Sequence, residues 1–435
     1  MKKISSLLMT LALSTSLYAE GYQVNLQSTK QTGMGHVGSA LKLGAESMHF
    51  NPGALGFLDS HMDFSVGMAG VFSKAEYNDN KGYKASTDNS VSTPLYGYAA
   101  FSIYDNLKAG IGVTTPYGSS MNWGKTWAGG HLVQDISLKA FVVQPTLAYR
   151  ITPKLSIGGG LMIAKGNVEL SRSIIPVGFL VNIPGFGEAY KDVVPVSATL
   201  NGNSDVALGY NLGVLYDISD KWSVGISYRS KMKMKVAEGE AELIYASESI
   251  KALVGGMVPP LDQGTFKAEL PLPANLNIGI AFKATEKMLL SVEYQGVNWE
   301  AYDKLSLKFT ENVLNGYSIE ADKNYNYAYA IRLGGEYAVT ERFDARAGFY
   351  VDTTPVDKAN YNPETPGMTK LGLSAGFSFR PTKNFSIDAA FLAILGMGAD
   401  GTYQYVNPLN KKEQPFNGSY KSTAYAPSLG FSYKF

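Results

Sequence analysis

The last fourteen residues, Ser422-Thr-Ala-Tyr-Ala-Pro-Ser-Leu-Gly-Phe-Ser-Tyr-Lys-Phe435, alternate between two kinds of side chain along their whole length. One parity carries the large apolar side chains and the other carries small or polar ones. Period-2 alternation predicts an extended strand with one face in an apolar medium and the other in a wet or crowded one. A strand tall enough to span lipid and ending on an aromatic residue is typical of the closing strand of an outer-membrane β-barrel.

The first nineteen residues have the features of a secretory signal peptide. Lys2 and Lys3 give a positive start, residues 4–17 are mostly apolar, and Ala19 offers a small residue for cleavage. We therefore expect residues 1–19 to be removed. No other stretch approaches the roughly 18 apolar residues that a spanning helix needs. Leader and closing strand together predict the outer membrane of a Gram-negative bacterium.

The composition excludes several kinds of site. The chain has no Cys and only four His, without close paired spacing, so we expect no metal and no cofactor. Its 38 basic residues nearly balance its 37 acidic ones, which gives no electrostatic case for nucleic acid. Only 17% of the residues are charged, whereas 28 Tyr, 20 Phe and 46 Gly suit barrel strands with aromatic girdles.

Short polar turns recur along the chain and allow the strands to be counted. Six of them join apolar runs, at residues 103–107, 151–155, 218–222, 284–288, 339–343 and 381–385. Longer polar connections lie between them, for example at residues 78–91, 118–134, 171–195 and 407–418. Six turns join twelve strands, and one further strand at each end gives fourteen. We predict an all-β fold, a 14-stranded antiparallel transmembrane β-barrel over residues 61–435, rather than a water-soluble β-protein.

The segment ahead of the barrel, residues 20–60, does not alternate like a spanning strand. It is Gly-rich and too short to form a domain with its own core. It is either a periplasmic tail or a plug inside the lumen. Its apolar side chains favour the plug, because a solvated tail would leave them exposed.

Motifs in this segment resemble the amino-terminal hatch of the FadL/TodX family. They are Gly21-Tyr-Gln-Val-Asn25, Gly33-Met-Gly-His36, Gly38-Ser-Ala40 and Phe50-Asn-Pro-Gly-Ala54. A second match, Gly110-Ile-Gly-Val-Thr-Thr-Pro-Tyr-Gly118, is similar to the third strand of that family. The resemblance implies an outer-membrane transporter of long-chain fatty acids and other hydrophobic compounds. One departure is Gly53, where the family commonly has Ala.

The resemblance also implies where a gate would lie. The plug would move at Asn51, Pro52 and Gly53, and the solute would leave through a gap beside a kinked third strand. Gly110, Gly112 and Pro116 favour such a gap, because Gly weakens ladder pairing and Pro removes a donor. The alternative is that these glycines only pack against the plug.

Two long loops carry apolar residues where water-exposed segments are expected. The residues that would capture substrate are Ile175, Phe179, Leu180, Phe186, Leu253, Val254 and Met257. By the resemblance, these loops match in position those of the external capture groove. The alternative is that the two loops bury each other as a cap.

A row of basic residues follows one strand, and parity with Ser223 and Ser227 predicts that it faces the lumen. The row comprises Arg229, Lys231, Lys233 and Lys235. There it could attract the carboxylate of a fatty acid. The favoured alternative is that it pairs with lumen acids such as Glu293, or with lipopolysaccharide phosphates near the rim.

Taken together, the residues and the resemblance predict a transporter and not an enzyme, since no His lies in a recognisable catalytic motif. The expected function is uptake of hydrophobic small molecules, foremost long-chain fatty acids, by capture on loops and lateral release. An aromatic hydrocarbon transporter and a structural or adhesion protein are the alternatives. Expected partners are the substrate, outer-membrane lipid or lipopolysaccharide, and the barrel-assembly machinery through Phe435. We expect a monomer.

Overall fold

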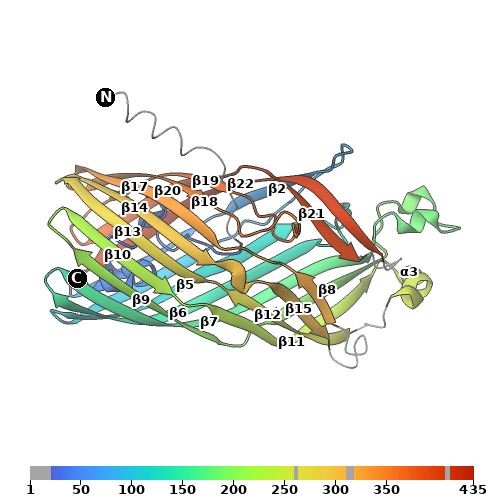
Figure 1. Ribbon diagram of the computed structural model, residues 1–435, viewed down its shortest axis with the longest axis horizontal. Helices are drawn as coiled ribbons and strands as arrows, with labels where there is room; N and C mark the ends of the chain where they lie inside the picture. Colours follow the sequence, from blue (N-terminus) through green and yellow to red (C-terminus); the bar gives the residue numbers. More distant parts are fainter. Residues whose placement is uncertain (1–20, 259–262, 310–317, 407–411) are drawn as a thin grey trace.

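The computed structural model describes residues 21–258, 263–309, 318–406 and 412–435 (Figure 1). The expected signal peptide lies outside these residues. In the described part of the chain, no helix is long and apolar enough to cross a membrane. Strands dominate the structure, and every pairing between them is antiparallel, as the alternating sequence pattern predicted.

The described strand segments group into fourteen spans, because many spans are interrupted by a bulge or a short break. In chain order they are β1 (Met62–Ala69) with β2 (Phe72–Asn78), β3 (Lys84–Ser86) with β4 (Leu95–Tyr104), β5 (Leu107–Asn122), β6 (Asp135–Thr152), β7 (Leu155–Ile175), β8 (Val196–Asn203) with β9 (Ala207–Asp217), β10 (Trp222–Arg229) with β11 (Met232–Tyr245), β12 (Gln263–Leu272) with β13 (Ala274–Thr285), β14 (Met288–Asn298) with β15 (Lys304–Phe309), β16 (Ser318–Asp322) with β17 (Ala328–Thr340), β18 (Phe343–Asp352), β19 (Lys370–Phe379), β20 (Phe385–Gly396) with β21 (Ala399–Val406), and β22 (Glu413–Lys434).

The sheet closes on itself between its first and last strands. β1 pairs with β4 on one side and with β22 on the other, where Ser65 lies opposite Ser432. The six predicted tight turns join neighbouring spans at one end of the ring, which we call the turn end. The long connections and α3 (Glu248–Val254) lie at the opposite end, the loop end (Figure 1). The predicted 14-stranded barrel is confirmed.

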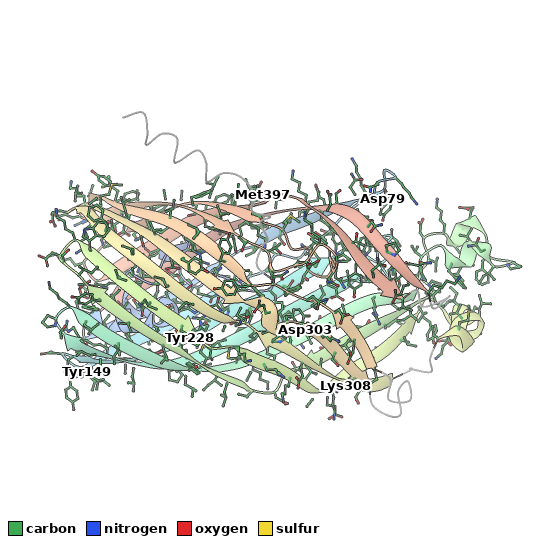
Figure 2. All side chains as sticks on the ribbon, in the orientation of Figure 1. Asp79, Tyr149, Tyr228, Asp303, Lys308 and Met397 are labelled. Carbon is green, nitrogen blue, oxygen red and sulfur yellow. The ribbon has the colours of Figure 1, made fainter. Side chains whose placement is uncertain are left out.

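The outer face of the ring is apolar, as a lipid-facing surface must be. On β22 the predicted row is exposed, including Leu429 and Phe431. Tyr149 and Tyr228 project outward from β6 and β10 (Figure 2). Buried residues of the opposite parity face the interior, where Ser and Asn alternate with small apolar residues.

The amino-terminal segment, which we expected to be a plug, packs against wall residues of many strands, and we refer to it as the plug. It contains α1 (Thr29–Thr32), α2 (Ser47–Phe50) and two 3-10 helices, η1 (Gly44–Glu46) and η2 (Pro52–Phe57). Five further short helical turns lie elsewhere in the described chain: α3 at the loop end, η3 (Phe179–Asn182), η4 (Glu188–Tyr190), η5 (Gly255–Met257) and η6 (Trp299–Ala301).

Glycines of the barrel wall make room for the plug. A Cβ atom built at any of these positions would meet plug atoms; they are Gly110, Gly158, Gly213, Gly225, Gly279, Gly334, Gly348, Gly376 and Gly430. At Gly213, for example, the plug residues in the way would be Asn51, Pro52 and Gly53. At Gly158, Gly225, Gly334 and Gly348 the nearest plug atoms belong to the backbone, so there the plug backbone lies directly against the wall.

Candidate binding cavity and wall opening

An apolar cavity lies inside the barrel and is lined mainly by inward side chains from β6, β7, β8, β11, β12 and β15. The apolar lining comprises Ile136, Leu138, Val168, Leu170, Leu200, Met234, Val236, Phe266, Ala268, Leu270, Leu305 and Leu307. Tyr22 and Tyr302 complete the wall, and Lys323, Glu364 and Thr365 supply its charged and polar groups, with Ser119. A solute held here would touch hydrocarbon on most sides.

The sequence pattern did not predict this cavity, because the side chains that face the interior change parity between β10 and β11. Arg229 and Ser230 are both buried, although they are neighbours in the chain. Ser230 donates its backbone N–H to the carbonyl of Tyr210 and accepts a bond from the Tyr210 N–H through Oγ, each at 2.9 Å. Beyond this irregularity Met232 and Met234 face the interior, where strict alternation would have placed them outside.

The expectation that the whole basic row faces the lumen is therefore wrong for three of its four members. Lys231, Lys233 and Lys235 lie on the outer face. The ammonium groups of Lys233 and Lys235 pair with Glu269 at 2.7 and 3.5 Å, and more than half of each side chain is exposed. These lysines cannot contact a solute in the cavity.

Arg229 does face the interior, but it binds the plug. Its Nη2 donates to the carbonyl oxygen of His49 at 2.6 Å, and its Nη1 lies 3.2 Å from the Nε2 of the same residue. The side chain is buried, and Arg229 is not among the residues that line the cavity. It serves here as a tie between β10 and α2.

The predicted gate residues Asn51, Pro52 and Gly53 clamp the plug to the wall. The Asn51 amide donates to the carbonyls of Ser39 and Val214 at 2.6 and 2.9 Å. Its Oδ1 accepts from the Gly53 N–H at 2.9 Å and so caps η2. The structure brings all three residues together beside β7 and β9.

Two further groups of charged residues hold the plug from other sides. Glu293 on β14 accepts bonds from the backbone N–H groups of Gly38 and Ser39 at 2.9 and 2.6 Å, and Arg332 on β17 pairs with it at 3.1 Å. Such bonds between a carboxylate and backbone amides are stronger than neutral ones. The predicted partner of Glu293 was the basic row, whereas its actual cationic partner is Arg332.

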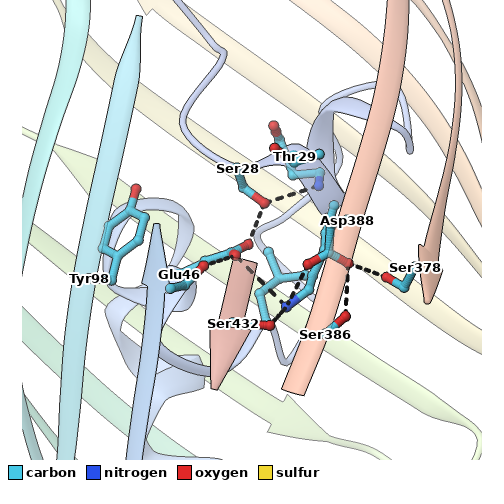
Figure 3. A network of polar contacts seen from close by, with 12 residues as sticks. Ser28, Thr29, Glu46, Tyr98, Ser378, Ser386, Asp388 and Ser432 are labelled. Atoms are coloured by element: carbon cyan, nitrogen blue, oxygen red, sulfur yellow. Dashed lines mark hydrogen bonds and ion pairs between the residues drawn. The ribbon is translucent and has the colours of Figure 1, made fainter. Parts of the chain in front are cut away.

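The second charged group contains Glu46 of the plug and Asp388 of β20, which lie close to Ser432 (Figure 3), and Lys30 of α1 pairs with both carboxylates. Its ammonium lies 3.8 Å from Glu46 of the plug and 3.7 Å from Asp388 of β20. Ser432 accepts a bond from it at 3.1 Å, and Ser378 binds Asp388. Both carboxylates are almost completely buried. Removing Lys30 would take from Glu46 the cation that neutralises it, whereas Asp388 would keep its pair with Arg346 at 3.5 Å.

The barrel wall is interrupted beside β5. The backbone ladder with β4 runs from Leu107 as far as Thr114, which lies opposite Tyr96. Beyond it, Leu95 of β4 contacts β5 only through the Thr115 side chain, whose Oγ1 accepts from the Leu95 N–H at 2.9 Å. The ladder with β6 shifts register between Thr114 and Tyr117, so the irregularity is centred on Pro116. Near the loop end the edge is covered again, where Asp88 donates to the carbonyl of Asn122 at 2.8 Å.

Pro116 lies at the interruption of the wall, whereas Gly110 and Gly112, which were also predicted to lie there, do not. Gly110 and Gly112 pair regularly with Ala100 and Tyr98 of β4. A Cβ at Gly110 would meet the side chain of Met48 in the plug, which supports the packing alternative for this residue.

The amino-terminal segment 22–27 occupies the exposed edge of β5 from inside. Val24 donates its N–H to the Pro116 carbonyl, and Gly118 donates to the carbonyl of Tyr22, each at 2.9 Å. The Gln27 side chain brackets Thr115, accepting from its N–H at 3.0 Å and donating to its carbonyl at 2.9 Å. These backbone groups would otherwise be unpaired at the opening.

Tyr22 also forms part of the cavity wall. Its ring packs edge-on against Trp299 and Tyr302, with centroid distances of 4.8 and 5.9 Å, and its hydroxyl donates to the carbonyl of Pro271. Segment 22–27 therefore reaches from the cavity, which Tyr22 lines, to the interrupted edge of β5. Sequence reasoning included this segment in the plug but did not assign it this position.

The apolar loop residues are divided between a buried cluster and an exposed surface. Ile175, Leu180 and Val254 are buried in the cluster that also contains the cavity lining. Phe179 and Phe186 pack against that cluster and are partly exposed. Burial of the first three supports the cap alternative. Leu253 and Met257 remain exposed, by 39% and 54%, and offer an apolar surface at the loop end.

Comparisons with known proteins agree with this architecture. The family model described as outer membrane protein transport protein (OMPP1/FadL/TodX) matches residues 10–435. The chain is 23% identical to the long-chain fatty acid transport protein of Escherichia coli strain K12, with 92% of this chain and 94% of that protein covered. It is 24% identical to outer membrane protein P1 of Haemophilus influenzae strain Rd, with 91% of each chain covered.

Two solved structures share the fold. A FadL homologue from Pseudomonas aeruginosa superposes with a TM-score of 0.78 at 20% identity, covering 96% of this chain and 100% of that one. The toluene transporter TodX of Pseudomonas putida superposes with a TM-score of 0.71 at 17% identity, covering 97% and 99%. At these identities the likeness concerns the fold alone.

Proposed function

Since the chain belongs to the OMPP1/FadL/TodX family of outer-membrane proteins that transport hydrophobic compounds, we propose that it takes such compounds up through the apolar cavity and releases them sideways beside β5. The observation that carries the proposal is the position of segment 22–27, which lines the cavity with Tyr22 and pairs with the edge of β5 at the opening. A solute in the cavity needs only this segment to move in order to reach the membrane.

The proposed path begins at the loop end. Leu253 and Met257 present the exposed apolar surface that a solute would meet first. Transfer from there into the cavity keeps the solute out of water, which is favourable by about 25 cal/mol per Å² of apolar surface buried. Ile175, Leu180 and Val254 shape the wall behind this surface and do not contact the solute on entry.

The proposed exit is gated by the plug. Asn51 holds η2 against β9, and segment 22–27, which belongs to the same plug, pairs with β5. A shift of the Asn51-Pro52-Gly53 turn would loosen the plug and allow segment 22–27 to separate from Pro116. Each neutral hydrogen bond broken costs about 1 kcal/mol net, so partial separation is accessible to thermal motion.

The substrate class depends on the charge in the cavity. A long-chain fatty acid would be favoured by a free cation, and the basic row was the proposed source of one. Lys231, Lys233 and Lys235 face outward, where Lys233 and Lys235 pair with Glu269 and a lipopolysaccharide phosphate is the partner that we propose for Lys231. The apolar tail of a fatty acid and an aromatic hydrocarbon both suit the remaining lining.

A pair of substitutions on one strand tests the cavity. Leu138→Trp would fill the cavity from β6, whereas Leu147→Trp adds the same ring to the lipid-facing side of that strand. Uptake of labelled toluene and labelled dodecanoate would be measured in cells that produce each variant. The proposal requires Leu138→Trp to abolish uptake of whichever compound the unmodified protein carries, with Leu147→Trp unaffected. Equal uptake by both variants would refute it.

A further inference from the structure

We propose, on the basis of the transport function above, that Glu364 is a specificity-determining residue. It neutralises Lys323 inside the cavity and makes the cavity select uncharged hydrophobic compounds over carboxylates. Among the described residues that line the cavity, Lys323 is the only cation and Glu364 the only anion. The two are each other's partners.

The ion pair is close and shielded from water. The Nζ atom of Lys323 lies 2.5 Å from Oε2 of Glu364. The two side chains are exposed by 2% and 10%. The ring of Tyr302 lies beneath the ammonium at 6.0 Å, which adds a weak attraction of the same sign. Lys323 therefore has little need of a further anion.

Both partners are fixed by their backbones. The N–H of Lys323 donates to the carbonyl of Asp303 at 2.7 Å, and the next residue, Asn324, has a positive φ of 46° and donates to the same oxygen. The N–H of Glu364 donates to Oδ1 of Asn362 at 2.9 Å. These bonds fix the backbone from which each of the two side chains extends.

Glu364 is carried into the barrel by the connection between β18 and β19, residues 353–369. Most of this connection is buried, including Val356, Tyr361 and Met368. The indole of Trp123 donates to the carbonyl of Pro363 at 3.0 Å and holds the connection from the loop side. This inward-folded loop places a carboxylate at the end of an apolar cavity, where it can determine whether charged or uncharged ligands bind.

The charge balance decides which ligand fits. A carboxylate in the cavity would meet a cation already paired, and its own charge would stay uncompensated among apolar side chains, which is strongly unfavourable. To bind Lys323 it would have to displace Glu364, which then becomes the unpaired buried charge. An uncharged compound leaves the pair intact and gains the full benefit of burial.

Two ligands of equal chain length test this. Equilibrium binding of labelled dodecanoate and of its methyl ester would be measured at neutral pH on the full-length protein in lipid nanodiscs, with empty nanodiscs subtracted. The unmodified protein should bind the ester at least roughly tenfold more tightly than dodecanoate, a difference of about 1.4 kcal/mol. Tighter binding of dodecanoate would overturn the proposal without any variant.

The variants then assign the effect to Glu364. Glu364→Gln keeps the shape but frees the Lys323 charge, so the affinity for dodecanoate should rise by roughly tenfold or more while that for the ester changes little. The double variant Lys323→Met with Glu364→Gln should lose this gain. An unchanged preference in Glu364→Gln would contradict the role of Glu364.

The ester also separates this proposal from the transport function. If Leu138→Trp leaves ester binding intact, the cavity is not the binding site and the proposed function fails. If Leu138→Trp abolishes ester binding but Glu364→Gln does not alter the preference for charge, only the specificity proposal fails.

Discussion

Gly118 of β5 donates its backbone N–H to the carbonyl oxygen of Tyr22 at 2.9 Å, and the ring of that same Tyr22 lines the apolar cavity. One residue of the plug thus contacts both the compartment that would hold a solute and the edge of the wall where it would leave. Under the proposed function, movement of segment 22–27 would join the two and allow a solute to pass.

Gln27 is the strongest side-chain tie between this segment and β5. Gln27→Ala removes both bonds to Thr115 and leaves two backbone groups without these partners. We expect the closed state to lose about 2 kcal/mol and uptake of hydrophobic compounds to rise several-fold. Gln134→Ala is a matched control, because the Gln134 side chain donates instead to the Lys125 carbonyl in a loop. Unchanged uptake in Gln27→Ala would show that the segment does not restrict flux.

Wall glycines should be necessary for seating the plug. Gly213→Ala places a methyl group where Asn51 and Gly53 now lie, and overpacking of this kind costs about 1–3 kcal/mol. We expect a lower unfolding temperature and faster proteolysis of the plug. Gly97→Ala on β4 is the control, since no atom lies within 4 Å of the added carbon. Similar behaviour of the two variants would mean that the plug is not packed as described.

The outward lysines should not affect substrate binding. Replacing Lys231, Lys233 and Lys235 together by Gln removes three positive charges from the outer face. We expect the affinity for dodecanoate to stay within about twofold of the unmodified protein, because exposed charges on the far side of the wall are screened. A loss of tenfold or more would place these lysines on the substrate path.

The loop end should become less stable in acid because of His131. Burial lowers the pKa of His131 to about 4, and its ring packs against Tyr405 with centroids 4.3 Å apart. In the unfolded chain the imidazole binds its proton near pH 6.5, so the folded state loses stability as the pH falls from about 6.5 to about 4, by roughly 3 kcal/mol at most. Below pH 4 this loss levels off.

Thermal unfolding between pH 7.5 and pH 4 measures this effect. His131→Phe keeps an aromatic ring against Tyr405 without a titrating group, so its unfolding temperature should fall less over the same range. Parallel decline of both proteins would assign the acid sensitivity to other residues.

The turns and the alternation predicted the fold well because both are local. A short turn such as residues 151–155 forces its flanking strands to pair, and lipid forces one parity to be apolar, so the strand number and closure follow from the chain alone. The prediction of a plug has a related basis, since the apolar residues of segment 20–60 would be exposed in a solvated tail.

The cavity could not be predicted because it depends on two non-local departures. At Arg229 and Ser230 the strand changes parity through its contacts with Tyr210, and a one-residue shift exchanges every later side chain between lumen and lipid. Glu364 enters the lumen on a connection whose inward path is set by contacts with distant residues such as Trp123. Neither the parity change nor the inward path of the connection is indicated by a local sequence pattern.

The most direct test of the central claim is to lock segment 22–27 to β5. Gln23 and Tyr117 form an antiparallel bridge, and such pairs lie about 4.5–5.5 Å apart between Cα atoms, within the range of a disulfide. The chain has no other Cys, so Gln23→Cys with Tyr117→Cys gives one defined cross-link. Ala347→Cys with Ala375→Cys, a paired position between β18 and β19, cross-links the wall as a control.

Uptake of a labelled hydrophobic compound would be compared in the oxidised and the reduced form of each variant. We predict that oxidation stops uptake in the Gln23–Tyr117 variant, that reduction restores it, and that neither treatment affects the control. Full uptake with the Gln23–Tyr117 cross-link formed would contradict release through the opening beside β5.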